Sequence, residues 1–445
     1  MKLYPDSKVY IFCPGNYAGG GPELLHQLAS ALISFGVETY TVYGAMTKGI
    51  FNPEDPVHDA YKKYHVPYTG QLEDNSKNAI IIPETITYEL YGGKKIRRVL
   101  WWMSVNNYLE NITDLVQSCL KEPLGTPMKK FFTFGKEDKD IEHWGQSEYV
   151  RQFLKLNGVT KINTVETHMS QTFLSKASKI DLSKKENLVA FNPKKGFEIT
   201  QRLIKIAPDL DWRPLENMTP AQVQNLLAKA KVYIDFGEFP GRERFPREAA
   251  LSNCVVITGR RGAAANDVDI NIPAEFKFGM QTTLQDIVKK IREVFENFER
   301  ELDKQKAFRD KELNAQKNFI AEVADVFKIK NFPPPSVAFV QGVQEKSFLL
   351  VQELFQSKDF TPKFIVDDVL AMTEISDELI WREQKRNYLR VGKNFIEIIT
   401  RDDAKFLYLE GRIKRFALLE PTDTELDEVK NFYEANDSDV LIFNR

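Results

Sequence analysis

The segment PGRERFPREAALSNCVVITGRRGAA, residues 240–264, holds five arginines and two glutamates around one predicted helix and one predicted strand. It follows KVYID (231–235), an apolar run of strand length, and it contains a second such run, CVVITG (254–259). Alternation of strand-length apolar runs with helical segments is typical of parallel α/β sheets. Ligands of such sheets bind at the carboxyl ends of the strands, which is where these charges fall.

Two series of alternating strands and helices run along the chain. The first begins with KVYIFC (8–13) and a helix within GGGPELLHQLASALISFG (19–36), and KKFFTFG (129–135) is a possible later strand. The second begins with NLVAF (187–191) and ends with the strand of the opening segment. Each series is long enough for a doubly wound sheet of its own.

The rest of the chain predicts helices, a break and a further small domain. Residues 282–329 are charged but carry apolar residues at helical spacing, which predicts helices packed on the preceding domain. NFPPPS (331–336) contains three consecutive prolines, which a helix cannot cross. We therefore predict an α/β fold with two Rossmann-like domains, residues 1–165 and 166–330, that face each other across a cleft. A small C-terminal α+β domain, residues 336–445, would follow.

Composition argues against several classes of protein. The formal net charge of the 445 residues is −2, so nothing in the chain as a whole favours nucleic acid as a partner. Three distant cysteines favour buried thiols over disulfides or zinc, and five histidines lack any metal-ligand spacing. The N-terminus has no signal-peptide pattern, and no apolar run has the length of a membrane span. We expect a cytoplasmic protein, with peripheral contact at the inner face of the membrane left open.

The charges of the opening segment suit a phosphate-bearing ligand. Arg242, Arg244 and Arg247 can offer forked donors to phosphate oxygens. Glu248, in the first turn of a helix, can accept hydrogen bonds from neutral hydroxyls such as a ribose diol. After the next strand, the loop GRRGAAAND supplies Arg261 among small residues. The alternative is a surface lattice of arginines and glutamates, which contributes little stability per pair.

Two further loops carry features that suit a ligand. FNPKKGFE (191–198) adds Lys194 and Lys195, whose charges suit a diphosphate leaving group. Because loops at the strand ends of one sheet can converge on one anion, we predict a nucleotide diphosphate there. In the first series, Gly19–Gly21 open a helix, where backbone N–H groups can approach a ligand. A tight turn without a ligand explains these glycines equally well, and their spacing matches neither a Walker loop nor GxGxxG.

Taken together, these motifs resemble those of GT-B-fold glycosyltransferases, nucleotide-sugar-dependent enzymes in the group that assembles bacterial surface polysaccharides. The resemblance covers about residues 8–328. It is carried by GNYAGGGPELLHQLA, IIIPET, VLWWMSVNNY, WGQSEYVRQFL, FNPKKGFE and GRERFPREAALSNCVVITGRRGAA, in this order along the chain. It implies that the C-terminal half binds the nucleotide sugar and that the N-terminal half binds a glycan or lipid-linked acceptor.

The resemblance also implies roles for individual residues. Lys194 or Lys195 would contact the diphosphate and Glu248 the ribose, while the glycine loop would lie near the transferred sugar. Trp102 and Asn106 would line the acceptor side, with burial in a strand as the alternative for the tryptophan. The chain departs from the best-known retaining pattern of two glutamates eight residues apart, because residue 240 is a proline. Retention and inversion of configuration therefore both stay open.

The predicted site needs no metal and no cofactor besides the donor, because fixed arginines and lysines can take the place of Mg²⁺ at a departing diphosphate. The DxD triplets at 138–140 and 267–269 are ascribed to chance. His26, His143 and Glu84 are candidates for a general base, each with a structural role as the alternative. Catalytic roles are predicted for Glu243, Arg244 and Glu248, and substrate binding for Gly19, Gly20, Gly21, Lys194, Lys195, Arg242, Arg247, Arg261, Trp102 and Asn106.

Three functions remain open at this point. The first is a glycosyltransferase that moves a sugar from a nucleotide-diphosphate sugar to a glycan or lipid-linked acceptor. The second is a nucleotide-sugar epimerase or hydrolase of the same fold, which would consume the donor without an acceptor. The third is a non-catalytic glycan-binding or scaffold protein that works through the C-terminal domain.

Overall fold

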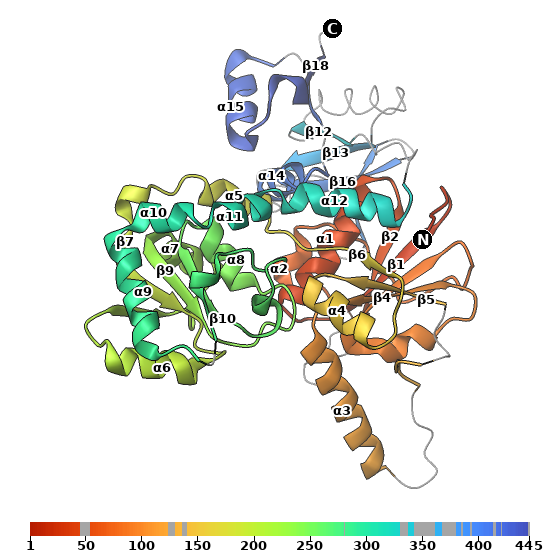
Figure 1. Cartoon of the computed structure of the whole chain (residues 1–445). Helices are drawn as coiled ribbons and strands as arrows, with labels where there is room; N and C mark the ends of the chain where they lie inside the picture. Colours follow the sequence, from red (N-terminus) through yellow and green to blue (C-terminus); the bar gives the residue numbers. More distant parts are fainter. Residues whose placement is uncertain are drawn as a thin grey trace. The chain divides into compact units, whose positions relative to one another are not determined.

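The computed structural model describes residues 1–44, 54–122, 130–135, 140–279, 281–329, 337–341, 361–366, 380–383, 386–391, 394–412, 415–419 and 421–443. By its internal contacts the chain divides into two compact units. One unit comprises Met1–Ile80 and Phe327–Arg445, and the other comprises Ile81–Val326. Within the described residues, three sheets carry the fold, and Figure 1 labels many of their strands and helices.

The first sheet has six strands in the order β2-β1-β3-β4-β5-β6. The pairs β1–β2, β4–β5 and β5–β6 are parallel, and most residues of β1, β3 and β4 are buried. Continuous apolar runs of this kind are typical of parallel strands covered on both faces. The strands are β1 (Lys8–Pro14), β2 (Glu38–Gly44), β3 (Ala79–Pro83), β4 (Arg97–Trp102), β5 (Ile141–Gly145) and β6 (Ile162–Thr164), and the helices along this part of the chain are α1 (Gly20–Ser34), α2 (Asp59–Lys62), α3 (Val105–Lys121), α4 (Glu148–Leu156) and α5 (Gln171–Ala177).

The second sheet has five strands in the order β11-β10-β9-β7-β8, and every neighbouring pair is parallel. Counted from β7, this is the doubly wound order 2-1-3-4-5, whose switch point lies between the first and third strands. Here those strands are β7 and β9, so a ligand is expected where they end. The strands are β7 (Glu186–Phe191), β8 (Asp211–Pro214), β9 (Ala230–Asp235), β10 (Val255–Gly259) and β11 (Lys277–Phe278).

Helices cover both faces of the second sheet. Helices α7 (Pro220–Lys229) and α8 (Arg244–Leu251) pack together and contact β7, β9 and β10. Helix α9 (Leu284–Glu296) packs with α6 (Phe197–Ile206) and also contacts β9 (Figure 1). Apolar side chains from the strands and from these helices form one continuous core.

The charged stretch after residue 282 folds as helices, as its apolar spacing predicts. Ile287, Ile291 and Val294 of α9 are buried, and so are Phe319 and Val323 of the last helix. These residues recur at helical spacing, so one side of each helix packs on its neighbours and the charged side faces water. The helices that follow α9 are α10 (Phe298–Asp303), α11 (Lys306–Leu313) and α12 (Ala315–Val326).

The third sheet belongs to the C-terminal part of the chain. Its seven strands lie in the order β14-β15-β16-β13-β12-β17-β18. The pairs from β16 to β18 are parallel, whereas β14–β15 and β15–β16 are antiparallel. The elements are β12 (Val337–Gln341), β13 (Thr361–Val366), β14 (Ile380–Glu383), β15 (Arg386–Val391), β16 (Asn394–Thr400), α14 (Arg401–Leu409), β17 (Arg415–Leu419), α15 (Asp423–Tyr433) and β18 (Val440–Phe443).

The predicted fold class is confirmed: two parallel α/β sheets follow each other, and a smaller part with its own sheet and helices comes after them. Most pairs of the third sheet are parallel, so this part is closer to α/β than to the α+β arrangement that we expected. The domain boundaries at 165, 330 and 336 and the cleft between the first two domains stay predictions. The proline-rich segment 331–336 lies outside the described residues.

One predicted strand is wrong. KKFFTFG (129–135) is described from residue 130 onward, and residues 130–135 form no strand. The rings of Phe132 and Phe134 lie 5.8 and 5.5 Å from that of Trp102, between centroids. An apolar run can therefore be buried by packing its aromatic rings against a strand, without pairing its backbone.

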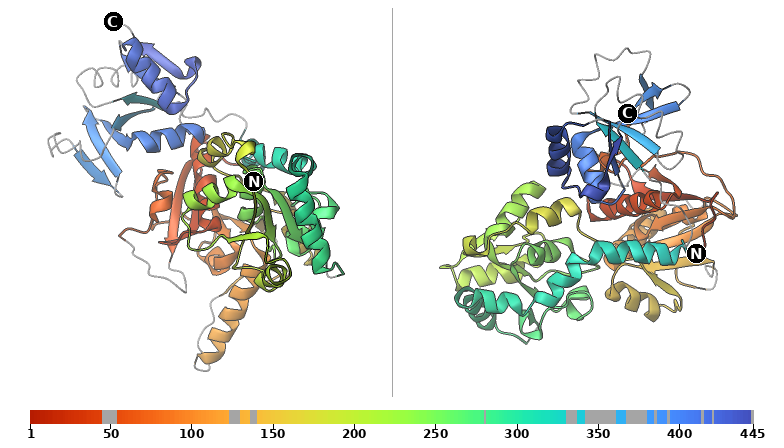
Figure 2. Two further views of the ribbon diagram at one scale, coloured as in Figure 1. Left: turned by 90° about the vertical axis from the view of Figure 1, so that its left-hand side faces the viewer. Right: turned by 90° about the horizontal axis from the view of Figure 1, so that it is seen from above.

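Helix α3 differs from the other long helices, because only Val105 and Tyr108 of its residues are buried. Figure 2 shows it extending away from β4 and β5 of its own unit. Its first turn is anchored by Ser104, whose hydroxyl accepts a hydrogen bond from the backbone N–H of Asn107 at 3.2 Å. The start of α3 is therefore fixed at the end of β4, while the rest of the helix faces solvent.

A buried lysine just before β7 contacts the C-terminal ends of two helices. The ammonium group of Lys185, just before β7, donates to the carbonyl oxygens of Leu227 at 2.9 Å, Ala230 at 2.8 Å and Ser252 at 2.6 Å. These carbonyls lie at the C-terminal ends of α7 and α8, where backbone acceptors lack helical partners and the helix dipole favours a cation. One positive charge thus satisfies both ends.

Replacing this lysine tests its contribution to stability. We expect Lys185→Met to lower the free energy of unfolding by roughly 3 kcal/mol, because three buried carbonyls lose a charged donor. Lys184→Met is the matched control, since the side chain of Lys184 is 80 % exposed. Thermal unfolding of the full chain compares the two variants, and equal midpoints would contradict the assignment.

Candidate functional site

Three loops meet at the carboxyl edge of the second sheet. They are residues 192–196 after β7, residues 236–243 after β9 and residues 260–262 after β10. The first two flank the switch point of the sheet, where ligands of doubly wound folds bind. This edge is the candidate site.

Glycines allow the backbones of these loops to touch. A Cβ atom on Gly196 would lie 2.4 Å from the carbonyl carbon of Phe236, and one on Gly262 would lie 2.2 Å from the carbonyl oxygen of Phe239. Both glycines also have positive φ angles, 62° and 53°, which favour residues without a Cβ. The loop after β9 is therefore clamped between its two neighbours, and no larger residue fits at either point.

Charged side chains pair across this edge. The ammonium group of Lys195 lies 2.9 Å from a carboxylate oxygen of Glu243, and Nε of Arg244 lies 2.5 Å from Oε1 of Glu248. Arg261 is further from its partner, with 3.9 Å between its Nη1 and Oε1 of Glu198. Cations and carboxylates of the three loops and of helices α6 and α8 thus pair along this edge.

These pairs differ in their access to solvent. The side chains of Lys195 and Arg244 are 37 % and 47 % exposed, whereas that of Glu248 is 6 % exposed. Lys194 is exposed, and its side chain has no ion pair with any residue that the structure describes. Its backbone N–H is held by Oδ1 of Asn192 at 3.1 Å. The cations can therefore meet a ligand from solvent, while Glu248 lies beneath them.

A buried carboxyl group shapes the loop after β9. Asp235 accepts hydrogen bonds from the N–H of Gly237 at 2.9 Å and from the hydroxyl of Tyr233 at 3.0 Å. Burial raises the pKa of Asp235 to about 6. A Cβ on Gly237 would lie only 2.4 Å from Cβ of Lys195, so this turn also sets the position of that lysine.

The start of α3 lies against the same loop, within the unit Ile81–Val326. Nδ2 of Asn106 donates to Oε2 of Glu238 at 2.8 Å, and the N–H of Val105 donates to the carbonyl oxygen of Pro240 at 3.1 Å. A Cβ on Gly241 would lie 2.1 Å from the carbonyl oxygen of Met103. Asn106 thus lies at the candidate site, and its contact with an acceptor stays a prediction.

Trp102 is not brought to the surface of the site. Its side chain has no solvent exposure, and its indole N–H donates to Nδ1 of His143 at 3.0 Å. The ring packs against Tyr108 and the phenylalanines of residues 130–135. The alternative that the sequence left open, burial in a strand, describes this residue, because a side chain without solvent exposure cannot stack on a sugar.

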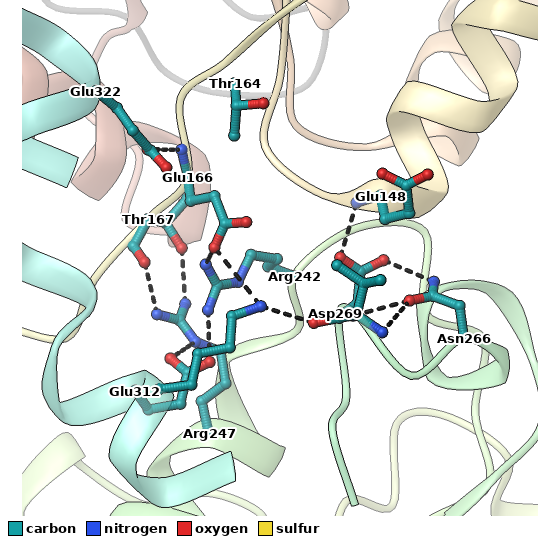
Figure 3. A network of polar contacts seen from close by, with 12 residues as sticks. Glu148, Thr164, Glu166, Thr167, Arg242, Arg247, Asn266, Asp269, Glu312 and Glu322 are labelled. Carbon is teal, nitrogen blue, oxygen red and sulfur yellow. Dashed lines mark hydrogen bonds and ion pairs between the residues drawn. The ribbon is translucent and has the colours of Figure 1, made fainter. Parts of the chain in front are cut away.

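Arg242 and Arg247 are buried beneath the site. Figure 3 shows their guanidinium groups meeting at the carboxylate of Glu312. Nε of Arg247 lies 2.6 Å from Oε2 of Glu312, whose side chain has no solvent exposure. Arg242 also pairs with Glu166. Although burial alone would raise the pKa of Glu312, the two arginines outweigh it and hold that pKa below its ordinary value.

The network continues into the connector between the two sheets. Arg247 donates to the hydroxyl and to the carbonyl oxygen of Thr167, each at 2.7 Å. The N–H of Glu166 donates to Oε2 of Glu322 on α12 at 2.7 Å, and burial raises the pKa of Glu322 to about 7. The loop after β9, the connector and the trailing helices are therefore tied together (Figure 3).

This network revises two predicted roles. Both guanidinium groups are buried and already paired with carboxylates, so we assign Arg242 and Arg247 a positioning role in place of phosphate contact. Along the chain, Arg242 precedes Glu243 and Arg244, and Arg247 follows them on α8. The arginines of the opening segment thus divide into a buried pair and an exposed set.

The glycine loop of the first sheet lies in the other unit. Gly19 precedes α1, and its N–H and carbonyl oxygen both bond to the hydroxyl of Tyr61, each at 2.8 Å. Gly20 and Gly21 form the start of the helix. A Cβ on Gly20 would meet no atom within 4 Å, so close packing does not require that glycine. Since Gly19 is the N-cap residue, the helix begins without a side-chain acceptor at that position.

All three candidate bases have structural partners. Burial lowers the pKa of His26 and of His143 to about 4, so both are neutral at physiological pH. Nδ1 of His26 contacts the carbonyl oxygen of Pro22 at 2.7 Å. Glu84, at the end of β3, accepts a hydrogen bond from the N–H of Met103 at 2.9 Å, and burial raises its pKa to about 7. Of the three, Glu84 is the group that titrates near neutral pH.

The acidic triplet at 267–269 has other partners than a metal. Asp267 pairs with Lys277 at 2.8 Å. Asp269 accepts the first N–H groups of α4, from Glu148 at 2.7 Å and Tyr149 at 2.9 Å, and so acts as its cap. In the described part of the chain, no group of three or more His, Cys, Asp or Glu residues is placed to hold a metal ion. The absence of a metal from the reaction stays a prediction.

Comparison with known proteins finds structural likeness but no close relative. No protein-family model matches the chain, and no curated protein matches it. The structure of Anabaena HepE in complex with UDP-glucose is similar over 72 % of this chain and 98 % of that chain, with a TM-score of 0.47 and 12 % identity. A glycosyltransferase from Rickettsia africae is similar over 73 % and 98 %, with a TM-score of 0.47 and 14 % identity.

An alpha-glucosyltransferase in complex with UDP and a 13-mer DNA is also similar, over 72 % of this chain and 99 % of that chain, with a TM-score of 0.45 and 10 % identity. All three TM-scores lie below 0.5. Any function must therefore be supported by the residues of the chain itself. Among the described residues, no helix combines the length and the apolar character needed to cross a membrane.

Sequence reasoning missed the partners of the buried arginines. Glu312 falls in the apolar stripe of α11 and α12, since Phe308 and Ala315 stand four residues before and three residues after it and are buried. A carboxylate on the buried face of a helix is expected to have a cationic partner there. That position was the available signal. Asp269 gave none, because its partners are backbone N–H groups of α4 and the amide of the nearby Asn266, and neither stands out in the sequence.

Substitution of Glu312 tests the network. Glu312→Gln leaves two buried guanidinium groups with less compensating charge, and we expect a loss of roughly 3 kcal/mol or more in the free energy of unfolding. Asp310→Asn on the same helix is the control, because its side chain is 48 % exposed and pairs with Lys306. Chemical unfolding of both variants measures the two losses. Equal losses in the free energy of unfolding would show that the buried network contributes no more to stability than an exposed ion pair.

A pair of glycine substitutions tests the close approach of the loops. Gly196 and Gly158 both have positive φ angles, 62° and 85°, but a Cβ on Gly158 would meet nothing within 4 Å. We expect Gly196→Ala to destabilise the protein by about 2 kcal/mol more than Gly158→Ala, since only the former adds a backbone clash to the φ penalty. Thermal unfolding measures the difference, and equal losses would show that the loops can separate freely.

Proposed function

We propose that this protein is a glycosyltransferase that uses a nucleotide-diphosphate sugar as donor and binds the donor at the carboxyl edge of the second sheet. The observation that carries the proposal is a pair of adjacent ion pairs next to the switch point. Lys195–Glu243 joins the loops that glycines fix, and Arg244–Glu248 lies at the start of α8. A cationic edge beside a recessed carboxylate suits a ligand with both phosphates and a sugar diol.

The lysines would stabilise the leaving group. Glycosyl transfer from a nucleotide sugar breaks the bond between the sugar and the diphosphate, so negative charge grows on the departing oxygen. Lys194 and Lys195 lie at the N-terminus of α6, whose N-cap residue is Gly196 and therefore supplies no side-chain acceptor. Ammonium groups and helix N–H groups there would favour the departing diphosphate.

Glu243 would keep Lys195 paired when the donor is absent. Their ion pair is partly exposed, with side-chain exposures of 37 % and 21 %, so water screens it and little is lost when the lysine turns to a phosphate. Glu248 is suited to accept hydrogen bonds from the ribose hydroxyls, and Arg244 would hold that carboxylate in place. Lys195 and Arg244 thus exchange or share partners as the nucleotide enters.

Fewer residues support the acceptor site than the donor site. Asn106 donates to Glu238 at the edge of the site, and Glu84 accepts from the N–H of Met103, just before the same helix. With a pKa raised to about 7 by burial, Glu84 could take a proton at physiological pH. We propose a growing glycan or a lipid-linked sugar of a bacterial surface polysaccharide as acceptor. Action without a metal, in the cytoplasm or at the inner face of the membrane, belongs to the same proposal.

Nucleotide binding tests the donor site. Titration calorimetry with UDP, GDP and ADP should find at least one that binds, and Lys195→Ala should weaken it about tenfold or more, because one charged hydrogen bond is lost. Lys205→Ala removes an exposed lysine near the other end of α6 and should bind as the parent protein does. If no nucleoside diphosphate binds the full chain, the proposal is wrong.

Product analysis separates transfer from the other two functions. A transferase should release nucleoside diphosphate from its donor much faster when an acceptor glycan is present, whereas an epimerase or hydrolase consumes the donor alone. Glu248→Gln keeps the shape of the side chain and should remove most of the turnover. Full turnover in that variant would refute the role of Glu248, and binding without any turnover would favour a non-catalytic protein.

A further inference from the structure

A short segment of the first unit lies between the glycine loop and the C-terminal part of the chain. It consists of α2 (Asp59–Lys62) and the turn of residues 63–65, and we call it the bridging segment. Its contacts with α1, β16 and α14 all lie within the unit formed by Met1–Ile80 and Phe327–Arg445. Its two ends face different partners.

On one side the bridging segment holds the start of α1. The buried hydroxyl of Tyr61 donates to the carbonyl oxygen of Gly19 and accepts from its N–H, each at 2.8 Å. The ring of Tyr61 stacks on His26 of α1 with 4.6 Å between centroids. Tyr64 donates to Oε1 of Glu23 in the first turn of α1 at 2.6 Å. The position of the glycine loop therefore depends on these two tyrosines.

On the other side the bridging segment contacts the C-terminal part. Nδ1 of His65 lies 2.9 Å from Oε1 of Glu397 on β16, and Nε2 lies 2.9 Å from Oδ2 of Asp403 on α14. The ring of Tyr64 meets Phe406 edge to face, with 4.8 Å between centroids. The guanidinium group of Arg412 donates to the carbonyl oxygen of Tyr64.

The two carboxylates decide the state of the His65 ring. A neutral imidazole has one donor nitrogen, so hydrogen bonds from both nitrogens to carboxylates require the imidazolium form. The side chain is 13 % exposed, and the residue has a φ angle of 46°, which is uncommon for a residue other than glycine. The turn at residue 65 is therefore held in place by contacts from outside the segment.

We propose that His65 is a positioning residue through which the C-terminal part of the chain fixes the glycine loop Gly19–Gly21. Glu397 and Asp403 hold His65, the turn at His65 places Tyr64 and Tyr61, and Tyr61 holds both backbone groups of Gly19. The inference rests on the proposed function only where it takes the glycine loop to contact substrate. It gives the C-terminal part a role that does not require a ligand of its own.

We call the contacts of His65 with Glu397 and Asp403 the joint. Its strength depends on pH, because the His65 ring must be protonated to donate to both carboxylates. Burial alone would lower the pKa of His65, but its hydrogen bonds to Asp403 and Glu397 outweigh burial and hold that pKa above its ordinary value. The stabilisation is then fully present below about pH 6.5, the ordinary value, and is lost as pH rises through the folded value. The charged groups around the joint are Glu397, Asp403, Lys363 (paired with Glu397), Arg412, Lys63 (over the ring of Phe406) and Glu410 and Glu23 beside Tyr64.

Hydrogen exchange on the full chain tests the joint. Asp403→Asn weakens the hold on His65, and we expect backbone exchange in a peptide covering residues 15–25 to become about tenfold faster, because a charged hydrogen bond is lost. Asp402→Asn is the matched control: it removes a carboxylate from the same first turn of α14, and Asp402 is exposed. Equal exchange in Asp403→Asn and the parent, or equal acceleration in the two variants, would overturn the proposal.

The imidazole itself gives a second readout. The chain has five histidines, so nitrogen NMR of labelled protein can follow each ring. We expect the His65 signals to keep the doubly protonated pattern above the ordinary pKa of about 6.5 in the parent, and to lose it at lower pH in Asp403→Asn. A neutral His65 at pH 6 in the parent would contradict the proposal. Calorimetry with nucleoside diphosphates should be unchanged in Asp403→Asn, so failure of the donor site and failure of this joint remain separate results.

Discussion

The geometry of the candidate site depends on one buried carboxylate. Glu312 has no solvent exposure and compensates the charges of Arg242 and Arg247, which lie on either side of the loop that carries Glu243 and Arg244. Two guanidinium groups without a partner could not stay buried, so this stretch keeps its place only while α11 keeps its own. The exposed cations of the site are therefore positioned by a helix that the sequence places about seventy residues later.

The alternation of strands and helices could be predicted from the sequence, because buried positions are apolar and recur at the spacing of each kind of element. Parallel strands such as β7 and β9 are apolar runs, and the helices between them repeat at helical spacing. The convergence of the loops at Lys195 and Glu243 followed from topology alone, since strand ends of one sheet share an edge. The pattern does not show how an apolar run is buried. A strand was expected at residues 129–135, for example, but Phe132 and Phe134 pack their rings on Trp102 instead.

The arginines show where local reading stops. Arg242, Arg244 and Arg247 stand in one short stretch and look alike in the sequence, yet Arg244 is nearly half exposed and the other two are buried. The difference comes from Glu312 and Glu166, distant residues that no local spacing connects to them. The glycines were informative because their role is local. Gly196 and Gly262 stand where two backbones meet at the edge of the sheet, and such close approach leaves no room for a Cβ.

The first compact unit joins the beginning and the end of the chain, and this sets an order of assembly during synthesis. The N–H of Leu3 bonds to the carbonyl oxygen of Phe327, and His65 meets Asp403 across 338 positions. The contact of Leu3 cannot form before residue 327 has been synthesised, nor that of His65 before residue 403, whereas the middle unit ends at Val326. Residues 1–80 are thus expected to complete their packing only after residues 81–326 have been synthesised.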